Sequence, residues 1–148
     1  MPHSNNFSSG FSLIEVLLSV TIISMLAGLS LPLYASFQNR NDLDITAQGI
    51  AEALRRAQVY ARGVSGDSQW GVAIQSSGAV LFKGANFAAR DSTYDETIPI
   101  TNMTASGINE LSFAKLSGAP NITGTIMITS STNETRTITI NAKGMVSY

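Results

Sequence analysis

GFSLIEVLLSVTIISMLAGLSLPLYASF, residues 10–37, is the stretch of sequence that decides the fold of this chain. From residue 11 to residue 37 the run is apolar almost without interruption, and its one charged side chain is Glu15. About 20 consecutive apolar residues cross a hydrocarbon core of about 30 Å, so the run predicts a transmembrane helix. A carboxylate inside a membrane is costly and by default marks a function. Glu15 is therefore the first candidate functional residue.

Three interpretations of this amino-terminal segment compete. A secretory signal peptide has a positively charged start and an apolar run of about 7–15 residues, whereas this run is longer and no Lys or Arg precedes it. A plain membrane anchor would leave Glu15 incidental. In the third interpretation, which we favour, the chain is cut between Gly10 and Phe11. The new amine then lies one helical turn from Glu15, and in a bundle a neighbour's amine can meet that carboxylate.

The motif GFSLIEV, residues 10–16, followed by an apolar helix that contains Pro32, resembles the class III signal of type IV pilins and type II secretion pseudopilins. The resemblance implies that a prepilin peptidase cuts after Gly10 and N-methylates Phe11. It also implies that Glu15 neutralises a neighbour's amine and sets subunit register. The implied partners are other pilin or pseudopilin subunits and an inner-membrane assembly platform. The leader departs from the family pattern, because it ends in two serines where Lys or Arg is usual.

Gly28 and Pro32 predict a kink within the apolar helix, because a proline removes one backbone hydrogen bond and disturbs the preceding turn. One interpretation is simply a kinked membrane anchor. The other, implied by the resemblance, is a segment between Ser24 and Pro32 that melts when the subunit enters a filament.

An amphipathic helix is expected to continue over residues 38–62. Apolar residues recur there at steps of three and four, at Ala47, Ile50, Leu54, Ala57 and Ala61. Asp42 and Asp44 are candidate caps for a second helix start after a kink. Arg55 and Arg56 are expected on a solvated face, and Gly63 as the helix stop.

After Gly63 the hydrophobic period changes to two, which predicts short strands. Two hairpins are expected, at 69–74 with 79–82 and at 125–129 with 137–140, together with strands at 110–114 and 145–148. Trp70 is expected as a packing residue. Residues 84–107 are predicted to form an irregular loop, with at most an edge strand at 98–100.

These elements predict an α+β fold in which a long helix packs on one small antiparallel sheet, a pilin-like arrangement. The expected organisation is a leader at 1–10, a transmembrane and filament-core helix at 11–37, an amphipathic helix at 38–62 and a β-rich head at 63–148. At the level of pattern, the head resembles the GspH/FimT type of pseudopilin or minor pilin.

The residue inventory argues against an enzyme. The 148-residue chain has no cysteine, and its one histidine, His3, lies in the leader. Disulfides are therefore excluded, and a chain without its leader lacks the residues of usual zinc sites and of histidine-based catalysis. We expect no cofactor, and near Asp91, Asp95 and Glu96 the sequence favours a solvated turn over a calcium site.

Basic residues do not form a nucleic-acid-binding block. All nine Lys and Arg lie at or beyond Arg40 and are interspersed with acids, and the formal net charge is -1. Arg136 and Lys143 are the weak candidates for contacts to DNA, and the sequence argues against such binding.

The function expected from the resemblance is that of a pseudopilin of a type II secretion system, with a minor type IV pilus subunit for adhesion, motility or DNA uptake as the alternative. A membrane-tethered binding head that never polymerises is a third class. The expected location is the inner membrane, crossed once, with the head outside the cytoplasm.

Overall fold

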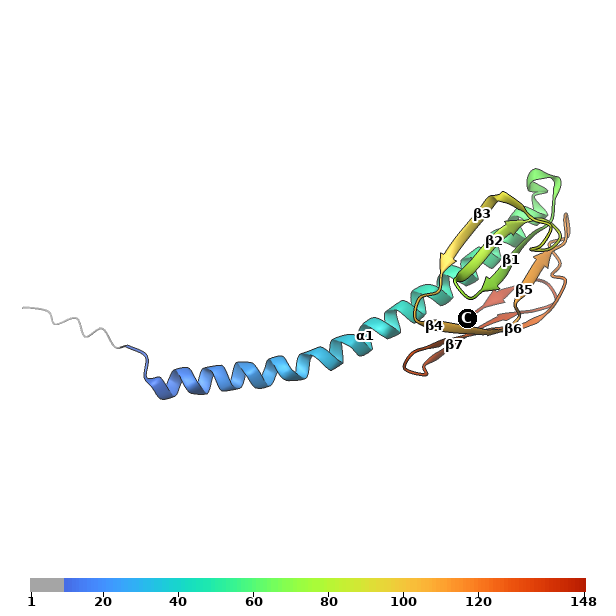
Figure 1. Cartoon of the computed structure of the whole chain (residues 1–148). Coiled ribbons are helices and arrows are strands. Elements are labelled where there is room, and N and C mark those ends of the chain that lie inside the picture. The colour runs from blue at the N-terminus through green and yellow to red at the C-terminus, as the bar shows by residue number, and fades with distance from the viewer. Residues whose placement is uncertain (1–9) are drawn as a thin grey trace, which may run out of the picture. The chain divides into compact units, whose positions relative to one another are not determined.

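A computed structural model describes the backbone of residues 10–148 and the side chains of these residues apart from 29–36. The chain divides into two compact units, with the boundary between Phe37 and Gln38. Helix α1 (Leu13–Arg62) supplies residues to both units (Figure 1). Because α1 already includes positions 42 and 44, the prediction that Asp42 and Asp44 cap a second helix start is wrong.

The two residues of the predicted kink, Gly28 and Pro32, lie within α1. Gly28 is helical, and a side chain at this position would meet no other atom within 4 Å. The side chain of Pro32 lies outside the described residues. The kink at Gly28 and Pro32 therefore stays a prediction.

The second unit is a head in which the last part of α1 packs with two antiparallel sheets of four strands each (Figure 1). The first sheet has the order β3 (Asp91–Pro99), β2 (Gly78–Lys83), β1 (Trp70–Gln75) and β5 (Glu110–Phe113). The second has the order β4 (Met103–Gly107), β6 (Gly124–Ser130), β7 (Thr135–Ile140) and β8 (Val146–Ser147). A short 3₁₀ helix, η1 (Ser65–Asp67), follows α1. The α+β class is confirmed, whereas the expectation of a single sheet is wrong.

Both predicted hairpins are confirmed. Strands β1 and β2 pair antiparallel up to Gln75 opposite Gly78, and β6 pairs with β7 up to Thr129 opposite Thr135. At Gly78 a Cβ atom would lie 2.5 Å from the carbonyl oxygen of Ile98. Glycine at this position therefore lets β3 approach the hairpin closely enough to pair.

The irregular loop predicted for 84–107 is wrong, because β3 and β4 lie there. Each is the edge strand of its sheet. Most β3 side chains are exposed, so its residues carry no apolar–polar alternation for a period of two to reveal. Pro99 ends β3, at a sheet edge where the missing N–H costs no ladder hydrogen bond.

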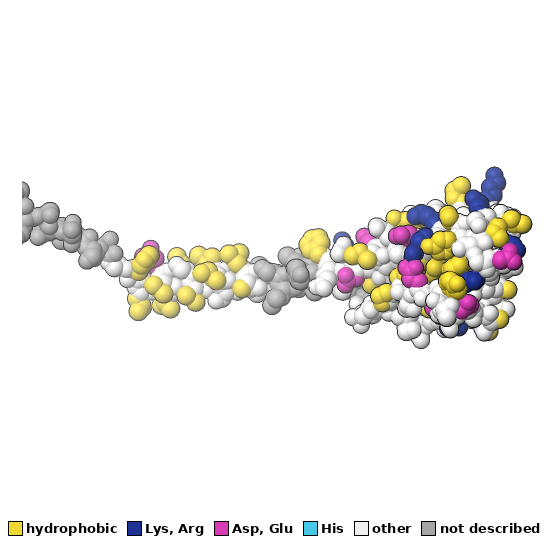
Figure 2. Space-filling view, turned by 90° about the horizontal axis from the view of Figure 1, so that it is seen from above, with side chains coloured by type: hydrophobic (Ala, Val, Ile, Leu, Met, Phe, Trp, Pro, Cys, Tyr) yellow, Lys and Arg dark blue, Asp and Glu magenta, His cyan; other side chains and the backbone are white. Residues whose placement is uncertain are grey.

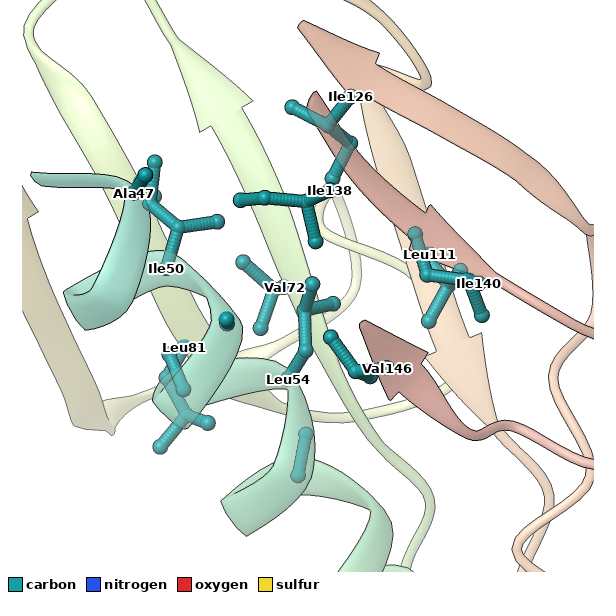
Figure 3. Packing of buried hydrophobic residues seen from close by; sticks show 14 of the residues in the cluster. Ala47, Ile50, Leu54, Val72, Leu81, Leu111, Ile126, Ile138, Ile140 and Val146 are labelled. Atoms are coloured by element: carbon teal, nitrogen blue, oxygen red, sulfur yellow. The ribbon is translucent and has the colours of Figure 1, made fainter. Parts of the chain in front are cut away.

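The core of the head forms where the α1 stripe meets both sheets. All five stripe residues predicted from the sequence have no exposed surface, namely Ala47, Ile50, Leu54, Ala57 and Ala61. Figure 3 shows Leu54 close to Val72 of the first sheet and Val146 of the second. Trp70 is also buried, and its Nε1 donates a hydrogen bond to the carbonyl of Ser65 at 2.8 Å, which confirms it as a packing residue.

Helix α1 ends at Arg62, as the position of Gly63 predicts. The amide of Gly63 donates to the carbonyl of Val59 at 2.8 Å. The left-handed backbone conformation, however, falls on Val64 (φ 55°) rather than on Gly63. Such a conformation is unusual for a β-branched residue, so the glycine does not serve here as the left-handed cap.

Arginines on α1 hold the helix to the strands. Arg56 donates two hydrogen bonds of 2.7 Å to the carboxylate of Glu96 on β3, and Arg55 donates to the carbonyl of Val146 at 3.1 Å. Arg55 is exposed and Arg56 partly so, as expected for a solvated face, and both also donate to acceptors far along the chain. Near the start of the head, Arg136 on β7 pairs with Asp44 at 2.6 Å.

Leu54→Ala is expected to lower the free energy of unfolding of the head by about 2–5 kcal/mol, because it removes buried methyl groups at the junction of helix and sheets. Urea unfolding of the whole chain in detergent, followed by circular dichroism, measures the change. The matched control is Val59→Ala on the same helix, where the side chain is 65% exposed and the expected change is within about 0.5 kcal/mol. Equal losses in the two variants would contradict this account of the core.

Candidate functional site

Gly10 and Phe11 lie on non-helical backbone before the start of α1 at Leu13. Phe11 is 84% exposed, and a Cβ atom at Gly10 would meet no other atom within 4 Å. The peptide bond between these residues is therefore accessible to a peptidase. Nothing in the described chain itself requires the glycine for space.

The first turn of α1 places Glu15 next to this junction. The amides of Glu15 and Val16 donate to the carbonyl of Ser12 at 3.0 and 3.2 Å. A carboxylate in a first turn interacts favourably with the helix dipole. Residues four apart lie on one helix face, so a helix extended to Phe11 would put the amine of a cut chain on the side of Glu15.

The first part of α1 exposes large apolar side chains on all sides. Between Leu13 and Leu26 their exposed fractions range from 50% to 79%. Figure 2 shows this part of the helix as a mainly hydrophobic surface with an acidic side chain near its start. A helix that is apolar all round is stable where lipid or other helices cover it.

The hydroxyl groups of the helix between Leu13 and Leu26 are satisfied by its own backbone. Ser19, Thr21 and Ser24 each donate to the carbonyl four residues earlier, at 2.7 Å. Such bonds keep a polar side chain satisfied without water. In the described part of the chain, the carboxylate of Glu15 forms no ion pair. It is therefore the group in this stretch that needs a partner from outside.

No helix within the described part of the chain is both long and apolar enough to cross a membrane. The predicted span, 11–37, includes residues 29–36, whose side chains lie outside the described residues. The transmembrane helix stays a prediction.

The three acids considered for calcium lie on strand β3 rather than in a loop. Asp95 accepts hydrogen bonds from Arg90, Glu96 accepts from Arg56, and Asp91 accepts from the amide and hydroxyl of Thr93. The hydrogen bonds from Thr93 lower the pKa of Asp91. Among the described residues, no three side chains of the metal-binding types gather.

The two cations considered for DNA contacts have different partners on α1. Arg136 is occupied by Asp44, with a distance of 2.6 Å between Nε and Oδ1. Lys143 is exposed, and its backbone carbonyl accepts a hydrogen bond from Gln58 at 2.9 Å. The structure therefore does not bring them together as a paired cationic site.

Comparison with known proteins identifies the amino-terminal segment. Residues 5–31 match the family model described as the prokaryotic N-terminal methylation motif. No curated protein and no solved structure matches the chain significantly. The match includes Gly10, Phe11 and Glu15 and does not extend into the head.

The motif is a type IV pilin-like prepilin signal, and the proteins that carry it are structural rather than enzymatic. It implies processing by a prepilin peptidase and assembly with other pilin subunits. It is typical of an amino terminus anchored in the inner membrane with a periplasmic or extracellular head.

Sequence reasoning missed a groove on the head, which involves Asp42 and Ile45 on α1 and the ends of strands β3 and β4. Of the strands that form its far side, only an edge strand at 98–100 was allowed for, which corresponds to the end of β3. The one signal available from the sequence was Ile45, an apolar residue outside the predicted stripe.

Glu96→Gln is expected to lower the free energy of unfolding of the head at neutral pH. It should also make that free energy depend less on pH in the acid range. The guanidinium of Arg56 lowers the pKa of the Glu96 carboxyl. Because the folded pKa is depressed, this ion pair stabilises the head above the unfolded pKa, and the contribution is lost as the pH falls through the folded value. The expected loss at pH 7 is about 0.2–1 kcal/mol, because both partners are partly exposed.

Urea unfolding at pH 7 and pH 3 checks this expectation. Glu52→Gln is the matched control, because Glu52 is a second acid near Arg56, on the helix that carries Arg56. Its Oε1 lies 4.0 Å from Arg56 Nε, and its side chain is 71% exposed. If the stability of Glu96→Gln falls between pH 7 and pH 3 as much as that of the unaltered chain, Glu96 is not the group responsible.

Proposed function

We propose that this chain is a pseudopilin subunit of a type II secretion system, which assembles through its amino-terminal helix into a periplasmic filament for protein export. The observation that carries the proposal is an apolar helix surface, exposed on all sides, with one carboxylate at its start beside an accessible glycine junction. The methylation motif at residues 5–31 supports it.

Processing creates the charge that Glu15 needs. A prepilin peptidase cuts after Gly10, and the same enzyme N-methylates the new first residue, Phe11. The resulting amine is cationic at neutral pH and lies one helical turn before Glu15. An inner-membrane assembly platform then brings processed subunits together.

Assembly supplies a partner for the carboxylate. A charged side chain costs up to about 2.5–3.5 kcal/mol at the centre of a membrane-spanning helix on insertion scales, and Glu15, in the first turn, bears part of such a cost. Pairing Glu15 with the Phe11 amine of a neighbour offsets this cost only when two helices lie at one axial offset. The ion pair therefore both favours association and fixes the stagger between subunits.

The rest of the helix has two proposed roles. Residues 11–37 anchor the subunit in the inner membrane before assembly and form the filament core afterwards. Gly28 and Pro32 supply a kink or a locally opened turn, and neighbouring helices can satisfy the freed carbonyl. Within the secretion system, the head's pattern favours a subunit of the GspH/FimT type.

A minor subunit of a surface type IV pilus is the second candidate, because the same methylation motif serves both systems. Deletion of the gene separates the two. Loss of secreted proteins from the medium with surface pili intact favours the secretion system. Loss of adhesion, motility or DNA uptake with secretion intact favours the pilus.

The mature protein is expected to begin with N-methyl-phenylalanine at Phe11, as measured by mass spectrometry of the amino terminus. Gly10→Val should accumulate uncut chain without disturbing the head, because a side chain at this position meets nothing in the described structure. Gly28→Ala is the control, since it also fills open space and should be processed normally. An intact Met1 in the unaltered protein, or a cut after Ala35, would remove the basis of the proposal.

Glu15→Gln is expected to be cut and methylated normally and yet to give at least about thirtyfold less filament, because loss of one member of a buried charge pair costs about 2–5 kcal/mol. Sheared filaments quantified by immunoblot measure the yield. Ser19→Ala is the control, since this hydroxyl bonds its own helix backbone. Normal filament yield from Glu15→Gln would leave the carboxylate without the proposed role.

A further inference from the structure

A groove of about 410 Å³ lies on one flank of the head, between α1 and the ends of strands β3 and β4. Ile45 lines it from the helix with 59% of its surface exposed, and Ile98 and Met103 line it from the strands. Asp42 also lines the groove, and among the described residues its carboxylate forms no ion pair. The groove is therefore an apolar slot with one available acid.

A second surface, the end patch, consists of Val59, Leu116, Lys143 and Met145 near the end of α1. Its three apolar side chains are 63–70% exposed. The amide of Leu116 donates to the carbonyl of Ala61 at 3.0 Å, and the carbonyl of Lys143 accepts from Gln58 at 2.9 Å, so both loops are fixed to the helix. The ammonium group of Lys143 forms no ion pair within the described chain.

The groove carries an acid and the end patch carries a cation, each beside exposed apolar side chains. The charged parts of the two surfaces and their apolar parts are the same distance apart along α1. Gln58 donates to the carbonyl of Lys143, and Ala61 accepts from the amide of Leu116. Along α1, the number of residues in the step from Asp42 to Gln58 equals the number from Ile45 to Ala61. At 1.5 Å per residue this step is about 24 Å, too far for the acid and the cation to pair within one chain. A second copy that lies beside the first and is shifted once along the axis brings both pairs together.

The two surfaces also face opposite flanks of the helix. At about 100° per residue, the same step turns by about 160° around the axis. The contacts of the head agree, because Arg56 bonds Glu96 on β3 at the groove side, whereas Arg55 bonds Val146 of β8 at the other. Complementary surfaces on opposite flanks make a head-to-tail contact that repeats into a helical array instead of closing a dimer.

We propose that the end patch of a second copy of this chain docks in the groove of the first, offset by about 24 Å along the helix axis. Leu116 and Met145 of one copy cover Ile45 and Ile98 of the other, and Lys143 pairs with Asp42. This inference rests on the proposed function and adds to it a contact between heads.

The absence of cysteine from the sequence allows a direct test by cross-linking. Ile45→Cys and Leu116→Cys are expressed as two separate copies in one strain, and assembled filaments are oxidised. A disulfide forms when the Cα atoms come within about 7 Å. We expect a mixed dimer that needs both variants and that neither variant gives alone. Met127→Cys on β6, also exposed at 40%, replaces Leu116→Cys as the matched control and should give no mixed dimer.

Charge reversal tests the polar part of the contact. Asp42→Lys in the copy that carries Ile45→Cys should lower the yield of mixed dimer roughly two- to fivefold, the range for an exposed ion pair. Lys143→Asp in the other copy should restore it. Glu52→Lys, which changes an exposed acid of the same helix outside the groove, should leave the yield unchanged.

The outcomes separate this inference from the proposed function. Filaments of normal yield without the mixed dimer overturn the inference alone. A dimer through Ile45→Cys in both copies overturns it in favour of a two-fold interface, and a disulfide from Ile45→Cys to a different subunit overturns it in favour of another partner. If the unaltered chain enters no filament, both the proposed function and the inference fail.

Discussion

The exposed apolar surface between Leu13 and Leu26 is the constraint on which the rest of the structure depends. Apolar surface left in water costs about 25 cal/mol per Å², and half or more of the surface of each of these large apolar side chains is exposed. After Gln38 the same helix instead buries one apolar stripe against both sheets. One helix therefore serves two surroundings, an apolar one at its start and a packed head at its end.

The periodic elements of the fold could be predicted because each carries its signal locally. The stripe from Ala47 to Ala61 and the two central hairpins show their periods in the sequence itself. Strands β3 and β4 could not be predicted, because edge strands are largely exposed and their residues need not alternate. The split into two sheets depends on which distant strands pair, such as Gly78 of β2 with Pro99 of β3, and no local pattern records that choice.

In the candidate functional regions, too, the sequence indicates some residues, and only the fold brings the others together. Gly10, Phe11 and Glu15 stand out from the sequence because a lone carboxylate in an apolar run is conspicuous by composition alone. No local pattern in the sequence indicates the groove or the end patch. Their residues come from segments as distant as Asp42, Ile98 and Lys143, and only the folded head brings each set to one surface. The partner of Arg56, Glu96, could not be predicted for the same reason, since the pair depends on the packing of β3 on α1.

The two proposed contacts constrain different degrees of freedom. An ion pair between Glu15 and a neighbour's amine lies close to the helix axis, so it fixes axial position and leaves rotation about that axis nearly free. The groove and the end patch lie off the axis on opposite flanks of the head, so their contact fixes rotation as well. The ion pair leaves rotation open, and the contact between heads fixes it. Because the ion pair sets an offset of about one helical turn and the heads one of about 24 Å, the two contacts join a subunit to different neighbours. In the proposed assembly, the apolar helix then supplies most of the affinity, and the two polar pairs select which arrangement it stabilises.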